Sequence, residues 1–165
     1  MLEIKKYPNP IVRKRCQEVE KIDEETVKLI EEMKKKMIEA GGIGLAGNQV
    51  GIGKRIIIIL TEKGPEAFVN PKILKKSRET EVSEEGCLSL PGIRLNIKRA
   101  KEVLIKATDI ERRVLQIEAK DLVAQIFQHE IDHINGKLII DRIGFFERLK
   151  IRKQLKEIQE KYANF

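Results

Sequence analysis

The sequence has few of the features that would place the chain outside the cell or in a membrane. It contains only two cysteines, Cys16 and Cys87, too few for the disulfide framework of a small secreted protein. No segment approaches the roughly 20 consecutive apolar residues that a membrane-spanning helix needs. The first eight residues contain neither the apolar run of a signal peptide nor the pattern of a transit peptide. We therefore expect a cytoplasmic protein that does not engage a membrane.

The balance of charge is basic but mixed in sign. The chain has 33 Lys and Arg against 26 Asp and Glu, a net charge of +7 and a pI near 9.4. Such a balance favours acidic partners, including nucleic acid. The alternative is an ordinary solvated surface, which we favour because the two signs are interspersed, and we expect no specific DNA binding.

Apolar spacing in the first half of the chain predicts one helix followed by strands. Asp23 is a typical N-cap, and apolar residues recur at helical spacing after it until Gly41 and Gly42 stop the run. The β-branched run 55–60 predicts a buried strand. A turn then leads to a second short strand near residues 68–69.

The second half predicts a strand pair and two helices. Apolar residues alternate over 103–107 and 115–119, on either side of a polar turn, which indicates an antiparallel pair. A helix should begin near Asp121 and end at Gly136, and another should span residues 145–165. Helices around an antiparallel sheet make an α+β fold, and the length fits a single domain over 1–165.

Both histidines of the chain fall in one short segment, His129-Glu130-Ile131-Asp132-His133. On a helix, positions four apart lie one turn apart on the same face, so a single metal ion can bind both imidazoles. Glu130 would then lie beside the ion without binding it, within reach of a water molecule. The alternative is a pair of helix histidines without a metal, because this pattern also arises by chance.

A catalytic metal site of this type requires a third protein ligand and one open position. No third histidine exists, so another residue type must provide the ligand. Cys87 offers a soft thiolate donor, and Gly86 before it allows a close backbone approach. Taken alone, a cysteine is more often a small buried apolar residue, which is what we expect of Cys16.

A glycine-rich segment, residues 42–51, follows the first predicted helix and precedes the first predicted strand. This order is wrong for a dinucleotide- or phosphate-binding loop. Its glycines would let a substrate backbone come close, and Gln49 carries a neutral amide donor suited to an oxyanion.

Together, and in this order, the three segments resemble the signature motifs of the peptide deformylase family. These motifs are Gly-x-Gly-Leu-Ala-x-x-Gln, Glu-Gly-Cys-Leu-Ser and Gln-His-Glu-x-Asp-His with a following glycine, here at residues 42–49, 85–89 and 128–136. The resemblance implies antiparallel sheets around a central metal-binding helix, with N-terminal and C-terminal helices. It also implies a metal-dependent hydrolase that removes the formyl group from N-formylmethionyl nascent peptides and releases formate.

The resemblance also implies roles for individual residues. The metal ligands would be Cys87, His129 and His133, the same three residues that spacing and chemistry indicate. Glu130 would take a proton from the attacking water and return it to the departing amine. The oxyanion would be held by the metal, by the side chain of Gln49 and by the backbone N–H of Leu88.

Substrate binding is expected along the same segments. An apolar pocket near Ile43, Leu122 and Ile126 would receive the methionine side chain. Backbone groups at Ile43, Gly44 and Gly86 would pair with the peptide as an added strand.

The sequence does not decide which metal is bound, and it leaves two other functions open. A thiolate with two imidazoles suits zinc, ferrous iron, nickel or cobalt; the sequence alone favours zinc, and the resemblance favours ferrous iron. One rival function is a zinc endopeptidase that cleaves internal peptide bonds. The other is a non-catalytic basic protein that binds ribosomes or nucleic acid, against which Glu130 and Gln49 argue.

The predicted C-terminal helix is rich in basic residues. Some members of the resembling family bind the ribosome through a C-terminal helix, so we expect the ribosome as a partner. The alternative is a helix that only closes the core and leaves its charges in solvent.

Overall fold

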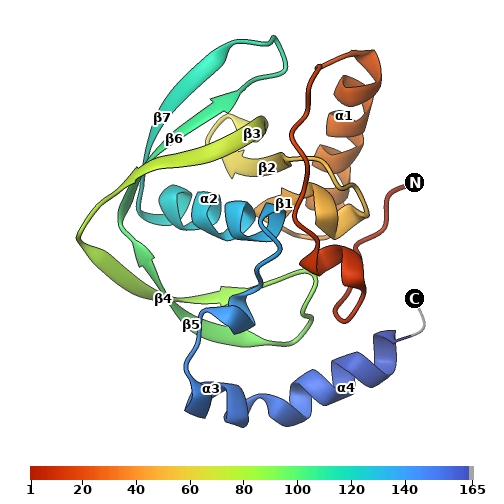
Figure 1. Cartoon of the computed structure of the whole chain (residues 1–165), viewed down its shortest axis with the longest axis vertical. Helices are drawn as coiled ribbons and strands as arrows, with labels where there is room; N and C mark the ends of the chain where they lie inside the picture. Colours follow the sequence, from red (N-terminus) through yellow and green to blue (C-terminus); the bar gives the residue numbers. More distant parts are fainter. Residues whose placement is uncertain (164–165) are drawn as a thin grey trace.

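The computed structural model describes residues 1–163, and in Figure 1 one helix, α2, crosses the centre of the molecule between two groups of strands. The helices are α1 (Glu24–Glu39), α2 (Asp121–Ile134), α3 (Phe145–Lys150) and α4 (Arg152–Tyr162). The strands are β1 (Gly44–Ala46), β2 (Ile56–Thr61), β3 (Gly64–Lys76), β4 (Thr80–Gly86), β5 (Arg94–Ala100), β6 (Glu102–Thr108) and β7 (Val114–Lys120). Short 3₁₀ turns occupy Pro10–Arg13, Gly47–Val50 and Ile139–Asp141.

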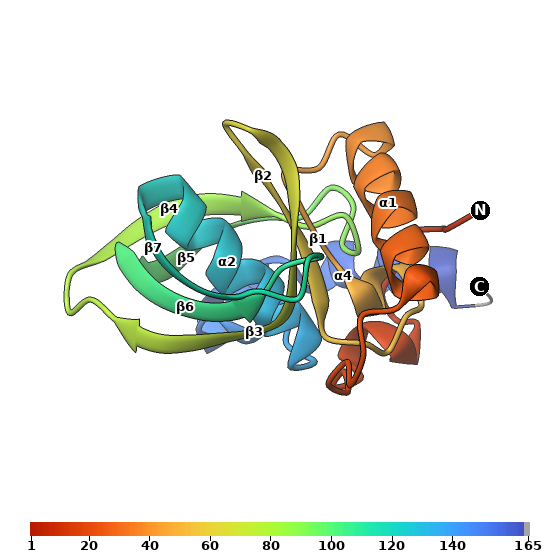
Figure 2. The same ribbon diagram turned by 90° about the horizontal axis from the view of Figure 1, so that it is seen from above.

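The strands form two antiparallel sheets around α2. The larger sheet has the order β1-β2-β3-β6-β7, and β4 pairs with β5 alone. Figure 1 shows α2 between these sheets and α3–α4 beyond the β4–β5 pair. Figures 1 and 2 both show α1 beside β2. The predicted α+β fold with antiparallel sheets around a central helix is therefore confirmed. No helix in residues 1–163 is both long and apolar enough to cross a bilayer.

Strand β2 is buried on both faces, which explains its unbroken run of isoleucines. Its odd-numbered isoleucines pack in one cluster with Phe127 of α2. Its even-numbered isoleucines pack in a second cluster with Met33 of α1. Side chains alternate across a strand, so a strand covered on both faces must be apolar at every position. The two helices are thereby held on opposite faces of the same strand.

The predicted helix boundaries on α1 and α2 are confirmed. The side chain of Asp23 accepts a hydrogen bond from the Thr26 N–H at 2.9 Å and caps α1. Helix α2 begins at Asp121, and Gly136 follows its C-cap with φ of +78°. The turn at Gly136 brings the end of α2 against the N-terminal segment, where the Cys16 N–H donates to the Ile134 carbonyl at 2.8 Å.

Two expected elements form, but their predicted extents are wrong. The strand expected near residues 68–69 is 13 residues long, because β3 continues past the β2 pairing to pair with β6. The helix expected over 145–165 is two helices that break at Ile151, a residue only 8% exposed. The last two residues of the expected helix, 164 and 165, lie outside the described residues.

A third apolar cluster holds the C-terminal part of the chain against the β4–β5 pair. Leu95 and Ile97 of β5 pack there with the segment 138–140, which follows α2. Ile151 and Ile158 join the same cluster, so the apolar side of α4 faces the molecule, whereas Phe145, Phe146 and Leu149 of α3 are exposed.

We expect Gly136→Ala to lower the free energy of unfolding by about 2–4 kcal/mol. A side chain at this positive φ is strained, and its Cβ would overlap the Arg13 carbonyl oxygen. Urea unfolding measures the effect. The matched control is Gly53→Ala, whose Cβ would meet no atom of residues 1–163 within 4 Å, and which should shift stability by less than about 0.5 kcal/mol. Equal effects of the two changes would contradict the role of Gly136.

Candidate active site

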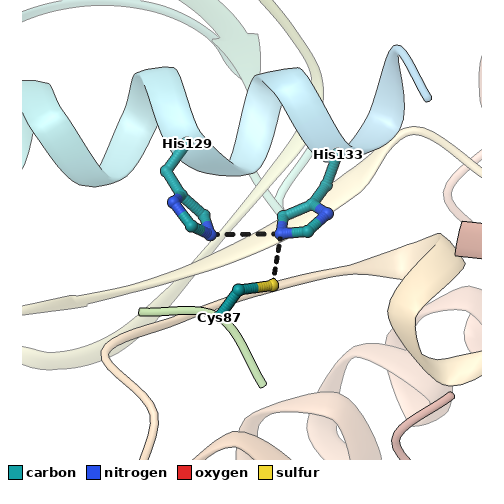
Figure 3. Close-up of side chains that lie close together, drawn as sticks. All are labelled: Cys87, His129 and His133. Atoms are coloured by element: carbon teal, nitrogen blue, oxygen red, sulfur yellow. Dashed lines mark hydrogen bonds between the residues drawn. The ribbon is translucent and has the colours of Figure 1, made fainter. Parts of the chain in front are cut away.

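Three side chains with metal-binding atoms converge beside α2. His129 and His133 lie one turn apart on one face of this helix, and Cys87, directly after β4, points toward them (Figure 3). The Cys87 Sγ lies 3.3 Å from His133 Nε2, and the two Nε2 atoms lie 3.1 Å apart. All three ligand atoms lie within 4.8 Å of one another. The structure therefore brings together the three residues that the sequence predicted as ligands.

The orientation of His129 is set by a buried carboxylate. Its Nδ1 lies 2.8 Å from Glu85 Oε2. Burial raises the pKa of Glu85, but hydrogen bonds from His129 and Arg99 outweigh burial and lower this pKa to about 2. The carboxylate is thus ionised and can only accept, so the proton of His129 lies on Nδ1. This tautomer directs the Nε2 lone pair toward Cys87 and His133.

Glu85 belongs to a buried network of charges. Arg99 on β5 donates to both Glu85 oxygens, at 2.9 and 3.0 Å, and its Nη1 donates to Asp132 at 2.6 Å. Arg142 donates to the same Asp132 from outside, through Nε at 2.9 Å. Burial raises the pKa of Asp132, but its bonds to the two arginines hold that pKa below its usual range. The network ties α2 to β5 and to the segment after α2.

The donor atoms fit a divalent metal ion. Ligand atoms on a tetrahedral site lie about 3.3–3.6 Å apart, from bond lengths of about 2.0–2.3 Å, and the 3.1 and 3.3 Å separations approach these values. Burial opposes a charge on His129, yet its bonds to Cys87 and Glu85 hold its pKa well above the ordinary value. A metal ion at this point would supply the positive charge that these bonds favour, and His129 would then be a neutral ring with its Nε2 lone pair free to bind. Burial holds the pKa of His133 well below its ordinary value, which leaves a neutral ring able to bind a metal.

Glu130 lies beside the ligands with its carboxylate in a buried position. It is 4% exposed, and burial raises its pKa to about 7. A Cβ on Gly44 would overlap the Glu130 carboxylate, so a glycine is required where β1 passes this side chain. Glu130 Oε2 has no hydrogen-bond partner within residues 1–163. The arrangement provides a buried group that exchanges protons near neutral pH.

Gln49 is held with its amide N–H groups toward Cys87. The Ala46 N–H donates to Gln49 Oε1 at 2.9 Å, which fixes the orientation of the amide. Its Nε2 then lies 3.3 Å from Ser89 Oγ and 3.7 Å from Cys87 Sγ. Gln49, predicted as an oxyanion donor, is thus brought to the ligand cluster.

A cleft of about 540 Å³ opens beside the ligand cluster. It is bordered by the segment 41–44, by 84–94 and by the first turns of α2, and Cys87, His129 and Glu130 line it as well. The residues predicted to contact substrate all line it: Ile43, Gly44, Gly86, Leu122 and Ile126. Leu88, predicted to donate its N–H, lines it as well.

Ile43 and Gly44, at the start of β1, were both predicted to pair with a peptide, but only the backbone groups of Gly44 point away from β2. The Ile43 carbonyl already accepts the Leu60 N–H of β2 at 2.9 Å. Strand residues alternate in the direction of their backbone groups, so those of Gly44 point away from β2. Strand β1 is an edge strand, which leaves Gly44 facing the cleft.

Several residues around the site had no role from the sequence. Glu85 and Asp132 lie within the motifs, and their position beside Cys87 and His133 is the signal that would have found them. Arg99 and Arg142 bind these carboxylates from distant positions in the chain. Lys6 also lines the cleft, and nothing in its local sequence indicates this.

The comparisons with known proteins agree with this geometry. The family model described as polypeptide deformylase matches residues 1–148. A peptide deformylase of Thermotoga maritima is 44% identical over 158 residues, which are 96% of this chain and 96% of that protein. One from Clostridium botulinum is 47% identical over 84% of this chain and 94% of that protein.

Solved structures agree over nearly the whole chain. The peptide deformylase of Plasmodium falciparum superposes with a TM-score of 0.93 at 37% identity, covering 98% of this chain and 97% of that one. The crystal structure of the Thermotoga maritima enzyme has a TM-score of 0.85 at 44% identity, covering 87% of this chain and 98% of that one. With a thiol, two imidazoles and a buried glutamate in the expected cleft, the chain belongs to the peptide deformylase family, metal-dependent hydrolases that remove the N-formyl group from nascent peptides.

Proposed function

We propose that this chain carries out the reaction of its family in the cleft beside α2, with Cys87, His129 and His133 as the ligands of one divalent metal ion. The observation that supports this most strongly is the convergence of these three donor atoms within 4.8 Å. His129 is oriented for this role by Glu85, as metal-binding histidines usually are by a carboxylate. When bound, the metal supplies Lewis acidity, which lowers the pKa of water and polarises the formyl carbonyl.

Glu130 is proposed to move the proton. With a pKa of about 7, its carboxylate takes a proton from the attacking water and returns it to the departing amine at neutral pH. The Nε2 of Gln49 and the N–H of Leu88 are proposed to donate to the formyl oxygen as negative charge develops there. Both donors lie on segments that border the cleft.

The peptide is proposed to lie along the free edge of β1. Gly44 and Gly86 would offer backbone groups to the chain of the substrate, as in the addition of a strand to a sheet edge. Ile126 is 6% exposed while Leu122 and Ile43 are about half exposed. The methionine side chain would therefore contact one buried apolar residue and two exposed ones.

Three finer points belong to the same proposal. Ferrous iron is the proposed metal in the cell, while zinc, nickel or cobalt would suit the same ligands. Residues 1–165 are proposed to form one domain, which the packing of α2 between both sheets supports. A cytoplasmic location, with nascent chains as the substrate, is proposed as well.

We expect the purified protein, prepared without oxygen, to release formate from formyl-Met-Ala-Ser. Glu130→Gln should slow this release at least about 100-fold, because the amide cannot shuttle a proton. Since Glu130 is not a ligand, the metal content of this variant should match that of the unaltered protein. Activity retained by Glu130→Gln would remove Glu130 from the mechanism. Cleavage of internal peptide bonds without formate release would instead favour the endopeptidase.

The two cysteines should respond differently to substitution. Cys87→Ala should lose both metal and activity, because two imidazoles alone hold a metal poorly. Cys16→Ala should keep both, since Cys16 is 5% exposed and packs in the apolar cluster around α2. Metal analysis and formate release on the same samples decide this. Full metal content in Cys87→Ala would refute the three-ligand site.

The ribosome is proposed as a partner through α4. The family model ends at residue 148, so α4 lies beyond it. The apolar side of α4 packs on the molecule through Ile158, which turns its basic residues outward. Four exposed basic residues lie at or near its start: Lys150, Arg152, Lys153 and Lys156. Contacts of such residues with ribosomal RNA would weaken steeply with salt.

Changing these four residues to glutamine should abolish co-sedimentation with ribosomes at low salt. A control variant removes four exposed lysines elsewhere, namely Lys28, Lys35, Lys72 and Lys106, and should bind as the unaltered protein does. Formate release should be unchanged in both variants, because none of the eight residues lines the cleft. Equal binding by both variants, or no binding by the unaltered protein, would refute α4 as the contact.

A further inference from the structure

The N-terminal segment joins the two loops that carry the proposed oxyanion donors. The Lys5 N–H donates to the Gln49 carbonyl at 2.7 Å. The Tyr7 N–H donates to the Ser89 carbonyl at 2.9 Å. Residues 5–7 therefore connect the 3₁₀ turn that contains Gln49 with the loop that follows Cys87. We call residues 5–7 the N-terminal strap.

The side chain at the centre of the strap reaches the second loop as well. Lys6 Nζ donates to the Leu88 carbonyl at 2.5 Å, an interaction across 82 positions of sequence. Lys6 also lines the cleft. Burial lowers the pKa of Lys6, while the nearby Cys87 opposes this shift. The Lys6 ammonium is thus partly desolvated beside Leu88 and Cys87.

The neighbouring lysine is placed quite differently. Lys5 directs its ammonium toward Glu3, at 3.5 Å, and their side chains are 35% and 80% exposed. Lys5 does not line the cleft within the part of the chain that the structure describes. Two adjacent lysines thus share the strap but not the site. A nonspecific attraction of the basic segment to an acidic surface would act on Lys5 and Lys6 alike, so it does not account for the difference between them.

We propose that Lys6 is a positioning residue of this site: its ammonium holds the Leu88 carbonyl and so keeps the Leu88 N–H directed into the cleft. This rests on the proposed function, in which that N–H donates to the developing oxyanion. Leu88 is partly exposed and lies in the turn after β4. The Leu90 and Tyr7 N–H groups donate to the carbonyls of Cys87 and Ser89 on either side of it, and Lys6 donates to the carbonyl of Leu88 itself. A donor acts on a transition state only when it is held in place beforehand, because its reorientation would otherwise raise the barrier.

The role predicts a defined kinetic effect. Removing one oxyanion donor outright costs roughly 100- to 1,000-fold in kcat. Loosening a donor that stays present should cost less, on the order of tenfold. The change should appear in kcat rather than in KM, because the interaction forms fully only in the transition state.

The experiment compares Lys6→Met, Lys6→Arg and Lys5→Met as full-length, metal-loaded proteins. Lys6→Met keeps the apolar stem but removes the donor, and should lower kcat for formyl-Met-Ala-Ser about tenfold, with KM changed less than about twofold. Lys6→Arg keeps a cationic donor and should retain at least half of kcat. Lys5→Met should match the unaltered protein. Metal content should be the same in all four proteins.

Amide hydrogen exchange provides a readout that does not depend on activity. Segment 87–90 should exchange at least several-fold faster in Lys6→Met than in Lys6→Arg or Lys5→Met. If the unaltered protein releases no formate, the proposed function fails, and exchange still decides whether Lys6 restrains Leu88. Unchanged kcat and exchange in Lys6→Met would overturn the proposal. So would a loss of metal content in Lys6→Met, or an equal loss of kcat in Lys5→Met.

Discussion

Glu85 lies where β4, β5 and α2 meet, and its carboxylate accepts hydrogen bonds from side chains of β5 and α2. Arg99 donates to both oxygens from β5, and His129 donates from α2 at 2.8 Å. Gln125, one turn before His129, adds a longer contact at 3.3 Å. A single buried group thereby aligns a ligand helix with the loop that carries Cys87. Loss of Arg99 would leave the buried Glu85 carboxylate without its cationic partner, and breaking a buried ion pair typically costs about 3–5 kcal/mol.

The charges around Glu85 also make the site dependent on pH. Its pKa of about 2 lies below the ordinary value of 4.5, so the interaction stabilises the fold at pH values above about 4.5. That contribution is lost as the pH falls through about 2, when the carboxylate takes up a proton. The contribution of Asp132 to stability depends on pH in the same direction, since its arginine partners lower its pKa as well. The network therefore supports the site fully at neutral pH.

Helix α2 can hold the site because its other contacts leave it little freedom. One side packs with the isoleucines of β2, and its end is covered by the segment around Arg13. The side that carries His129 and Glu130 faces the cleft instead. Catalytic groups on a rigid helix keep their geometry better than groups on loops. The loop after Cys87 and the turn that contains Gln49 are joined instead by the N-terminal strap.

The sequence by itself determined those parts of the protein that depend on neighbouring residues. The spacing of His129 and His133 on a helix, the cap at Asp23, the turn at Gly136 and the β6–β7 pair follow from local periodicity, and all are confirmed. The motifs also predicted which residues gather in the cleft. Local signals failed for β1, β4 and β5, because short or largely polar strands do not show a distinct apolar alternation.

Tertiary structure alone decided how the motifs are held in place. Arg99 and Lys6 reach Glu85 and Leu88 from 14 and 82 positions away, and no local pattern encodes such contacts. The break at Ile151 is of the same kind, since it accompanies the packing of this residue against the third cluster. Which residues can bind a metal follows from residue type and spacing. The orientation of their side chains depends on which distant segments the folded chain brings together.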